Sequence, residues 1–270
     1  MKKVKYIALI AACLLLSARI IMAQTNKEQL VVPLSDPGKP YQINVSLVLG
    51  SIKVVGYDGR DILINAESTA TDDNAVKGGM HRITPARVDV TAHEKDNVVD
   101  VTTGRPQSQI SLIIKIPANA TSIKLSTVNG GTVEASNING KIEVSDTNGS
   151  IKLINVGGSV VANTVNGDVD VTLRYADPKA AMAFTTLNGH IDVTFPASFK
   201  ANAKLRSDRG ELYSDFNMVT EKSVAKTTRD AKNGSYRIAI EDWVTGKING
   251  GGPELLMKSF LGNIFLRKGK

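Results

Sequence analysis

Four polar residues follow two Asn-Gly dipeptides at matching positions and are the most reactive grouping in the sequence. They are Asp168 and Asp170 after Asn166-Gly167, and His190 and Asp192 after Asn188-Gly189. Carboxylate oxygens are the ligands that Ca²⁺ prefers. Neighbouring carboxyl groups also resist joint ionisation, which raises one pKa and suits acid/base work. The sequence therefore predicts a ligand-binding face made of Asp168, Asp170, His190 and Asp192.

The same residues also fit an ordinary solvated strand face, and the known motifs for chemistry are missing. The Gly-Gly-x-Gly-x-Asp nonapeptide of calcium-binding repeats does not occur, and His81, His93 and His190 have no metal-ligand spacing. No Gly-x-Ser-x-Gly elbow is present either. We expect no catalytic residues, no metal site and no cofactor.

The elements that position these residues belong to a short repeat between Ser126 and Phe195. A turn dipeptide is followed by an alternating strand, in which Ile142 and Val144 take one face and Lys141 and Glu143 the other. Asn and Gly tolerate the left-handed backbone region, so Asn-Gly predicts a corner. The turns carry glycines 130, 140, 149, 158, 167 and 189, with a variant at 210.

The spacing of these glycines predicts the fold class. Steps of 9 or 10 residues followed by steps of 22 and 21 fit half-turns and then full turns of a coil of about twenty residues. We therefore expect an all-β fold, a parallel β-solenoid or β-helix. An antiparallel β-meander or sandwich is the alternative, because Asn-Gly is also a hairpin signal.

Residues 1–23 have the pattern of a signal peptide. Lys2, Lys3 and Lys5 precede an apolar stretch of about eleven residues, and a cleavage site is expected before Gln24. The apolar stretch is too short for a membrane span, so none is expected in the mature chain. Cys13, the only cysteine, raises the alternative of a lipid anchor, but the apolar run continues after it.

Removal of this segment changes the charge. Four of the 33 Lys and Arg residues lie in residues 1–23, so 29 remain against 26 Asp and Glu residues, a net charge of +3 instead of +7. This excess is too small for a nucleic-acid-binding face. An exported protein of the periplasm or cell surface is the expectation.

The rest of the chain predicts one domain. Residues 24–40 form a lead-in and N-terminal cap, and residues 41–270 form a single β-solenoid. The last strands end in Arg267, Lys268 and Lys270, which predicts a charged terminal edge protected from aggregation.

The repeated Asn-Gly-x-[Ile/Val]-x-[Val/Leu] units, the run from Thr186 to Pro196 and the segment Lys247 to Glu254 resemble the bacterial "putative adhesin" domain family over residues 45–268. The resemblance implies a parallel β-solenoid of unknown function in secreted envelope proteins, with no active-site residues to transfer.

Two functions fit these observations. The first is a non-enzymatic, adhesin-like binding or structural module of the cell envelope, whose partner is an envelope protein or a surface glycan. The second is a polysaccharide-active enzyme on a β-helix. Sugar-processing clefts stack aromatic rings on their substrates, and only 5% of this chain is aromatic, with Trp243 its one tryptophan. This composition favours the binding module.

Overall fold

The computed structural model describes residues 29–68, 76–77, 80–81, 88–221, 225–230, 235–240 and 243–270. The expected signal peptide, Cys13 and the first residues of the lead-in lie outside these ranges. The described residues form strands and turns and contain no helix long and apolar enough to cross a membrane.

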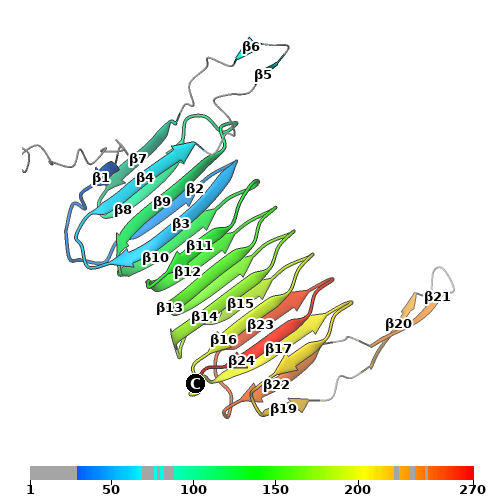
Figure 1. The fold of residues 1–270 in the computed structure, drawn as a ribbon. Coiled ribbons are helices and arrows are strands. Elements are labelled where there is room, and N and C mark those ends of the chain that lie inside the picture. The colour runs from blue at the N-terminus through cyan, green and yellow to red at the C-terminus, as the bar shows by residue number, and fades with distance from the viewer. Residues whose placement is uncertain are drawn as a thin grey trace, which may run out of the picture.

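Most strands stack into an elongated body (Figure 1). In the N-terminal part they are β1 (Gln29–Val32), β2 (Gln42–Ser46), β3 (Gly50–Tyr57), β4 (Ile62–Ser68), β7 (Val90–Lys95), β8 (Val98–Thr103), β9 (Ile110–Pro117), β10 (Asn119–Ser126), β11 (Val133–Ser136) and β12 (Asn139–Ser145). They continue as β13 (Ile151–Asn163), β14 (Val169–Ala176), β15 (Met182–Thr185), β16 (Ile191–Phe195), β17 (Ala201–Ser207), β18 (Leu212–Ser214), β19 (Met218–Glu221), β22 (Val244–Ile248), β23 (Glu254–Ser259) and β24 (Ile264–Lys268). Two hairpins stand apart: β5 (Val76–Lys77) with β6 (Met80–His81), and β20 (Ala225–Asp230) with β21 (Ser235–Ile240).

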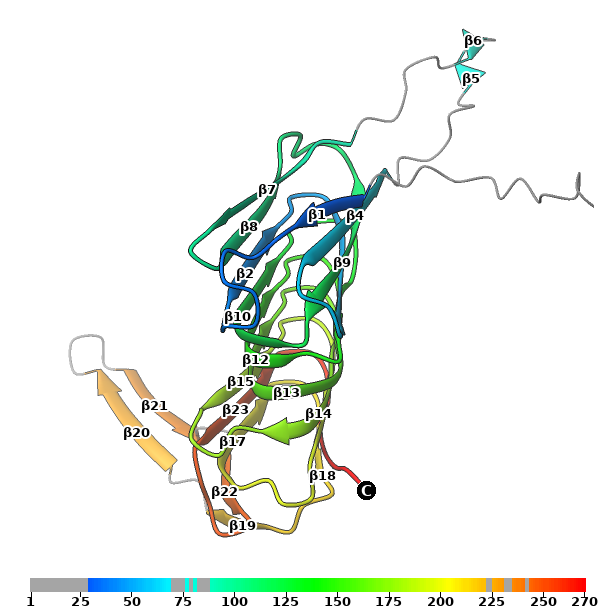
Figure 2. The same cartoon turned by 90° about the vertical axis from the view of Figure 1, so that its left-hand side faces the viewer.

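The body has two faces (Figure 2). The first face has the strand order β7-β8-β2-β10-β12-β13-β15-β23-β17-β22-β19. The second face has the order β1-β4-β9-β3-β11-β13-β14-β16-β24-β18. Strand β13 turns the corner and belongs to both. We call one strand of the first face and the following strand of the second face a rung.

The pairing identifies the fold as a parallel β-solenoid. Neighbouring rungs pair in parallel throughout the middle of the body, and antiparallel pairs occur only near its two ends. In one stacked row, Val133 lies beside Ile151, Ile151 beside Val169, and Val169 beside Ile191, at offsets of 18, 18 and 22 residues. The predicted coil is therefore confirmed, and the antiparallel meander is excluded.

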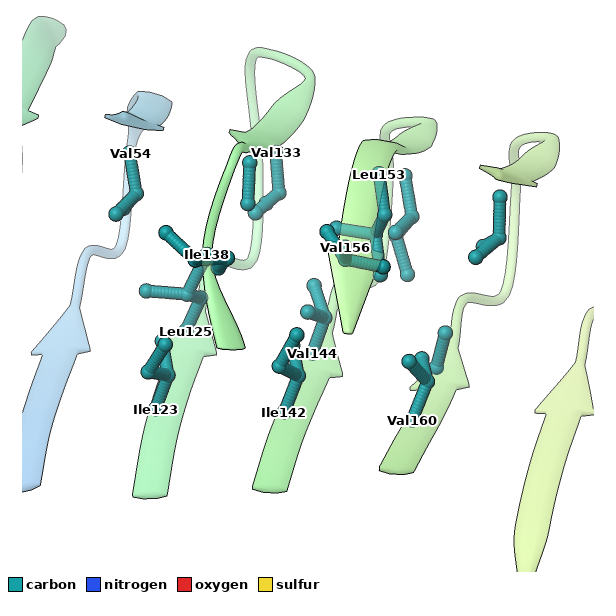
Figure 3. Packing of buried hydrophobic residues seen from close by; sticks show 14 of the residues in the cluster. Val54, Ile123, Leu125, Val133, Ile138, Ile142, Val144, Leu153, Val156 and Val160 are labelled. Atoms are coloured by element: carbon teal, nitrogen blue, oxygen red, sulfur yellow. The ribbon is translucent and has the colours of Figure 1, made fainter. Parts of the chain in front are cut away.

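The core lies between the two faces, where alternate side chains of each strand point inward (Figure 3). Ile142 and Val160 from the first face and Leu153 and Val156 from the other side of the coil are at most 1% exposed. Each rung buries its apolar side chains only because rungs lie above and below it.

The order of the rungs differs from the order of the chain at both ends. The β2–β3 rung lies between the β8–β9 and β10–β11 rungs. The C-terminal β23–β24 rung lies between β15–β16 and β17–β18. The prediction that Arg267 and Lys268 protect a terminal edge is therefore wrong, because β24 pairs on both sides.

Candidate functional site

His190 is held between two carboxylates of the preceding rung. Its Nδ1 lies 2.9 Å from Asp168 Oδ1 and its Nε2 lies 3.0 Å from Asp170 Oδ1. The backbone N–H of His190 also donates to Asp168 Oδ1 at 2.9 Å. These contacts follow from the parallel pairing of β14 with β16, which stacks the two Asn-Gly units in register.

Asp192 lies beside Asp170 in that register but has its own partner. Arg267 on β24 donates through Nε to Asp192 Oδ1 at 2.7 Å and to Oδ2 at 2.9 Å. The hydrogen bond to the Asp192 carboxylate raises the already high pKa of the Arg267 guanidinium. The structure thus brings together all four predicted residues. It also adds Arg267, which the sequence placed at an edge.

The polar side chains of this cluster on the second face already have partners. Both ring nitrogens of His190 already face carboxylate oxygens, and only the protonated imidazole donates at both nitrogens. Among the described residues, no group of three or more His, Cys, Asp or Glu side chains is placed to hold a metal ion. The cluster is a network of partly exposed polar and charged contacts, and a surface ion pair such as Arg267–Asp192 contributes little to stability by itself.

Two aromatic rings extend the same row. Asp192 lies beside Phe265, and Phe265 beside Tyr213, in adjacent strands. The two rings stack with centroids 5.2 Å apart and an angle of 7°, and the guanidinium of Arg267 lies 5.2 Å from the Phe265 centroid. The Tyr213 hydroxyl donates to Glu211, which raises the pKa of Tyr213.

Asparagine ladders mark the corners of the coil. In one corner Asn148 donates to Asn129, Asn166 to Asn148, and Asn188 to Asn166, at 2.6 to 2.7 Å. In a second corner Asn139 Nδ2 donates to Asn119 Oδ1 at 2.8 Å. Gly157 interrupts this second ladder, because it occupies the next position after Asn139.

A groove that the sequence did not predict lies along this row. Asn119, Asn139, Gly157 and Tyr175 occupy matching positions across four strands and all line it. Its volume is about 630 Å³, and Tyr175 is 55% exposed. The floor and walls also include Gly140, Gly158, Lys141, Ser159, Thr121, Ala120 and Asp177.

Arg174 fixes one end of the ladder instead of joining a carboxylate. Its Nη2 donates to Asn139 Oδ1 at 2.5 Å, and its Nη1 donates to the carbonyl of Asn155. Arg174 and Asp170 therefore do not pair: Asp170 faces His190, and Arg174 faces Asn139 and Asn155.

Comparisons with known proteins point to one family. The Toastrack DUF4097 family model matches residues 43–242. No curated protein matches the chain.

Two solved structures show similarity. A "putative cell adhesion protein" from Clostridium sporogenes ATCC 15579 is 11% identical, with a TM-score of 0.49, and the match covers 90% of this chain and 99% of that one. A "putative adhesin" from Bacteroides fragilis NCTC 9343 is 12% identical, with a TM-score of 0.33, and the match covers 88% of this chain and 95% of that one. Both TM-scores lie below 0.5, so the assignment rests on the family match, which spans well over half of the sequence. The chain belongs to the Toastrack DUF4097 family.

Proposed function

We propose that this protein is an exported, non-enzymatic binding module of the cell envelope, and that the groove beside Tyr175 binds a segment of glycan chain. The observation that carries the proposal is the row Asn119, Asn139, Gly157 and Tyr175. With rungs about 4.8 Å apart, this row spans about 14 Å. An open row of that length suits an extended chain.

The chemistry of the groove supports a sugar ligand. An exposed tyrosine ring offers an apolar face with a polar tip, and sites of this kind combine such a ring with a few placed polar groups. The side chains of Asn119, Lys141 and Asp177 line the groove and can hydrogen-bond to hydroxyl groups.

The placement of the carboxylates argues against hydrolysis at this groove. Glycoside hydrolysis needs two carboxyl groups that face each other across the bond to be cleaved. Asp177 is the one carboxylate in the lining, and its Oδ1 accepts the backbone N–H of Lys179 at 2.9 Å. On the second face, Asp168 and Asp170 face His190 and Asp192 faces Arg267.

Export rests on the sequence of residues 1–23, with its basic start and short apolar stretch. N-terminal sequencing of the protein recovered from the envelope fraction of cells tests it. We expect the recovered chain to begin at Gln24. A chain recovered from the cytoplasm with Met1 to Ala23 still attached would contradict export.

Binding is tested with a panel of envelope polysaccharides and oligosaccharides, by the shift that each causes in the thermal midpoint. A ligand that binds the native state raises the midpoint with concentration. We expect a saturable rise with at least one glycan, and its loss in Tyr175→Ala. Tyr213→Ala is the matched control, because Tyr213 is also exposed but lies on β18 and does not line the groove.

No rise with any glycan would reject the sugar ligand. An equal loss of binding in both variants would place the ligand away from Tyr175. A protein partner would then be the remaining occupant of this surface.

A further inference from the structure

One corner of the coil carries a column of buried hydroxyl groups, which we call the hydroxyl column. Each hydroxyl donates to a glycine carbonyl of the neighbouring rung, at 2.8 to 3.2 Å. The donor and acceptor pairs are Thr127 to Gly50, Thr164 to Gly149, Thr186 to Gly167, Ser259 to Gly189 and Ser207 to Gly262. This corner thus joins successive rungs by a repeated hydrogen bond.

Asp146 interrupts the hydroxyl column. The residues before Thr127, Asp146 and Thr164 are stacked in register, so Asp146 occupies the place of a threonine. It lies fifteen residues after Gly131, as Thr164 lies fifteen residues after Gly149. A Cβ built on Gly149 would lie 1.9 Å from Gly131 O and 2.5 Å from Asp146 Oδ2. Both oxygens therefore lie against the same side of the Gly149 α-carbon.

The carboxyl group of Asp146 is only half satisfied. Its Oδ1 accepts the backbone N–H of Asn148 at 3.1 Å. Its Oδ2 is buried and has no hydrogen-bond partner among the described residues, and Asp146 as a whole is 3% exposed. An ionised carboxylate only accepts hydrogen bonds, whereas a protonated one can also donate.

We propose that Asp146 is an acid-dependent joint between two rungs: its protonated Oδ2 donates to Gly131 O as Thr164 donates to Gly149 O, and ionisation breaks this bond. The proton comes from water and returns to it. The ionised state leaves a buried carboxylate oxygen beside a carbonyl oxygen, two acceptors without a donor.

Among the described residues, no ion pair joins Asp146 to a positively charged side chain. At the same position of the adjacent rungs lie Thr127 and Thr164, which do not ionise. The nearest charged side chains on its own strand are Lys141 and Glu143, which alternate outward and pair with each other at 2.6 Å. Burial raises the pKa of Asp146 to about 6. The backbone N–H groups of Thr147 and Asn148 act in the opposite direction and lower this pKa, because they stabilise the carboxylate, but burial has the larger effect.

The sign of the pH effect follows from this direction. Because the folded pKa lies above that of an unfolded aspartate, about 3.9, the protonated form is favoured in the native state. The contribution of Asp146 to stability is therefore complete below pH 4 and is lost as the pH rises through about 6.

The test compares the thermal midpoints of the wild type, Asp146→Asn and Asp146→Thr at pH 5 and pH 8. Asparagine has the same shape and always carries a donor, and threonine restores the hydroxyl column. We expect both variants to unfold at a higher temperature than the wild type at pH 8, and the difference to shrink at pH 5. Asp58→Asn, an exposed aspartate in a turn, should follow the wild type at both values.

Variants that are no more stable than the wild type at pH 8, or whose difference does not depend on pH, would overturn the proposal. A measurement on the unaltered protein covers the case in which the variants fold poorly. The carboxyl carbon of Asp146, followed by NMR, should titrate well above an ordinary aspartate. Titration near pH 4 would also overturn the joint.

Discussion

At the scale of single residues, space rather than backbone conformation explains the turn glycines on one corner. Gly149 and Gly167 do not have the positive φ that the Asn-Gly pattern predicted, and Gly210 and Gly262, which follow Arg209 and Leu261, do not have it either. A Cβ at these four positions would instead lie 1.8 to 2.3 Å from the carbonyl oxygen of the glycine in the neighbouring rung. The prediction of a left-handed turn is wrong for Gly149 and Gly167, although Gly130, Gly140, Gly158 and Gly189 do have positive φ.

Gly167→Ala tests this close approach. Its new Cβ would lie 2.2 Å from Gly149 O, and two stacked backbones cannot separate without breaking the rung pairing. We expect a loss of about 1–3 kcal/mol in the free energy of unfolding, measured by denaturant titration. Gly269→Ala, whose Cβ would lie 3.2 Å from Phe195 O, is the control and should lose much less. Equal losses in the two variants would contradict the explanation by close approach.

At the scale of elements, the C-terminal rung fills a place that the earlier chain leaves open. Strands β15 and β17 both pair with β23, and β16 and β18 both pair with β24. Leu255, Met257, Ile264 and Leu266 are at most 1% exposed and complete the core there. The rungs on either side therefore depend on a segment that is synthesised last.

Removal of residues 253–270 tests this dependence. Without the inserted rung, each of the strands β15 to β18 loses its pairing with β23 or β24 and the core contacts made there. In a solenoid each rung contacts only its neighbours, so the damage should remain local. We expect amide hydrogen exchange to show lost protection in β15–β18 and retained protection in β10–β12. Removal of Lys270 alone is the control, and full protection of β15–β18 after the larger deletion would contradict the rung order.

At the scale of the whole molecule, the sequence predicts the coil but not the order in which its rungs stack. The alternation of turn glycines between two corners, such as Gly140 and Gly149, is a local pattern and can be read directly. The insertion of the β2–β3 and β23–β24 rungs cannot be read from the sequence, because any apolar rung could in principle stack on any other. The sequence pattern does not predict strand β20 (Ala225–Asp230) either, because its residues are mostly polar or charged.

The contacts in the candidate sites are likewise of two kinds: some follow from the repeat in the sequence, and others depend on the order in which the rungs stack. Contact between Asp168 and His190 follows from matching offsets in the repeat, and the structure confirms it. Arg267 could not be placed beside Asp192, since their meeting depends on the inserted rung. The groove beside Tyr175 could not be read from the sequence, because its lining comes from four strands, β10, β12, β13 and β14, that only the stacking of the rungs brings together.

The measurement that tests the rung order most directly is disulfide formation between engineered cysteines on the second face, in a chain that starts at Gln24 and so has no other cysteine. In the structure Asp192 lies beside Phe265, and Tyr213 lies one rung further on. Adjacent rungs are about 4.8 Å apart and allow a disulfide, whereas two rungs, about 9.6 Å, do not.

We therefore expect Asp192→Cys with Phe265→Cys to form a disulfide on mild oxidation, and Asp192→Cys with Tyr213→Cys to remain reduced. A solenoid whose rungs stacked in chain order would place β18 directly on β16. It would give the opposite result, and that result would contradict the account.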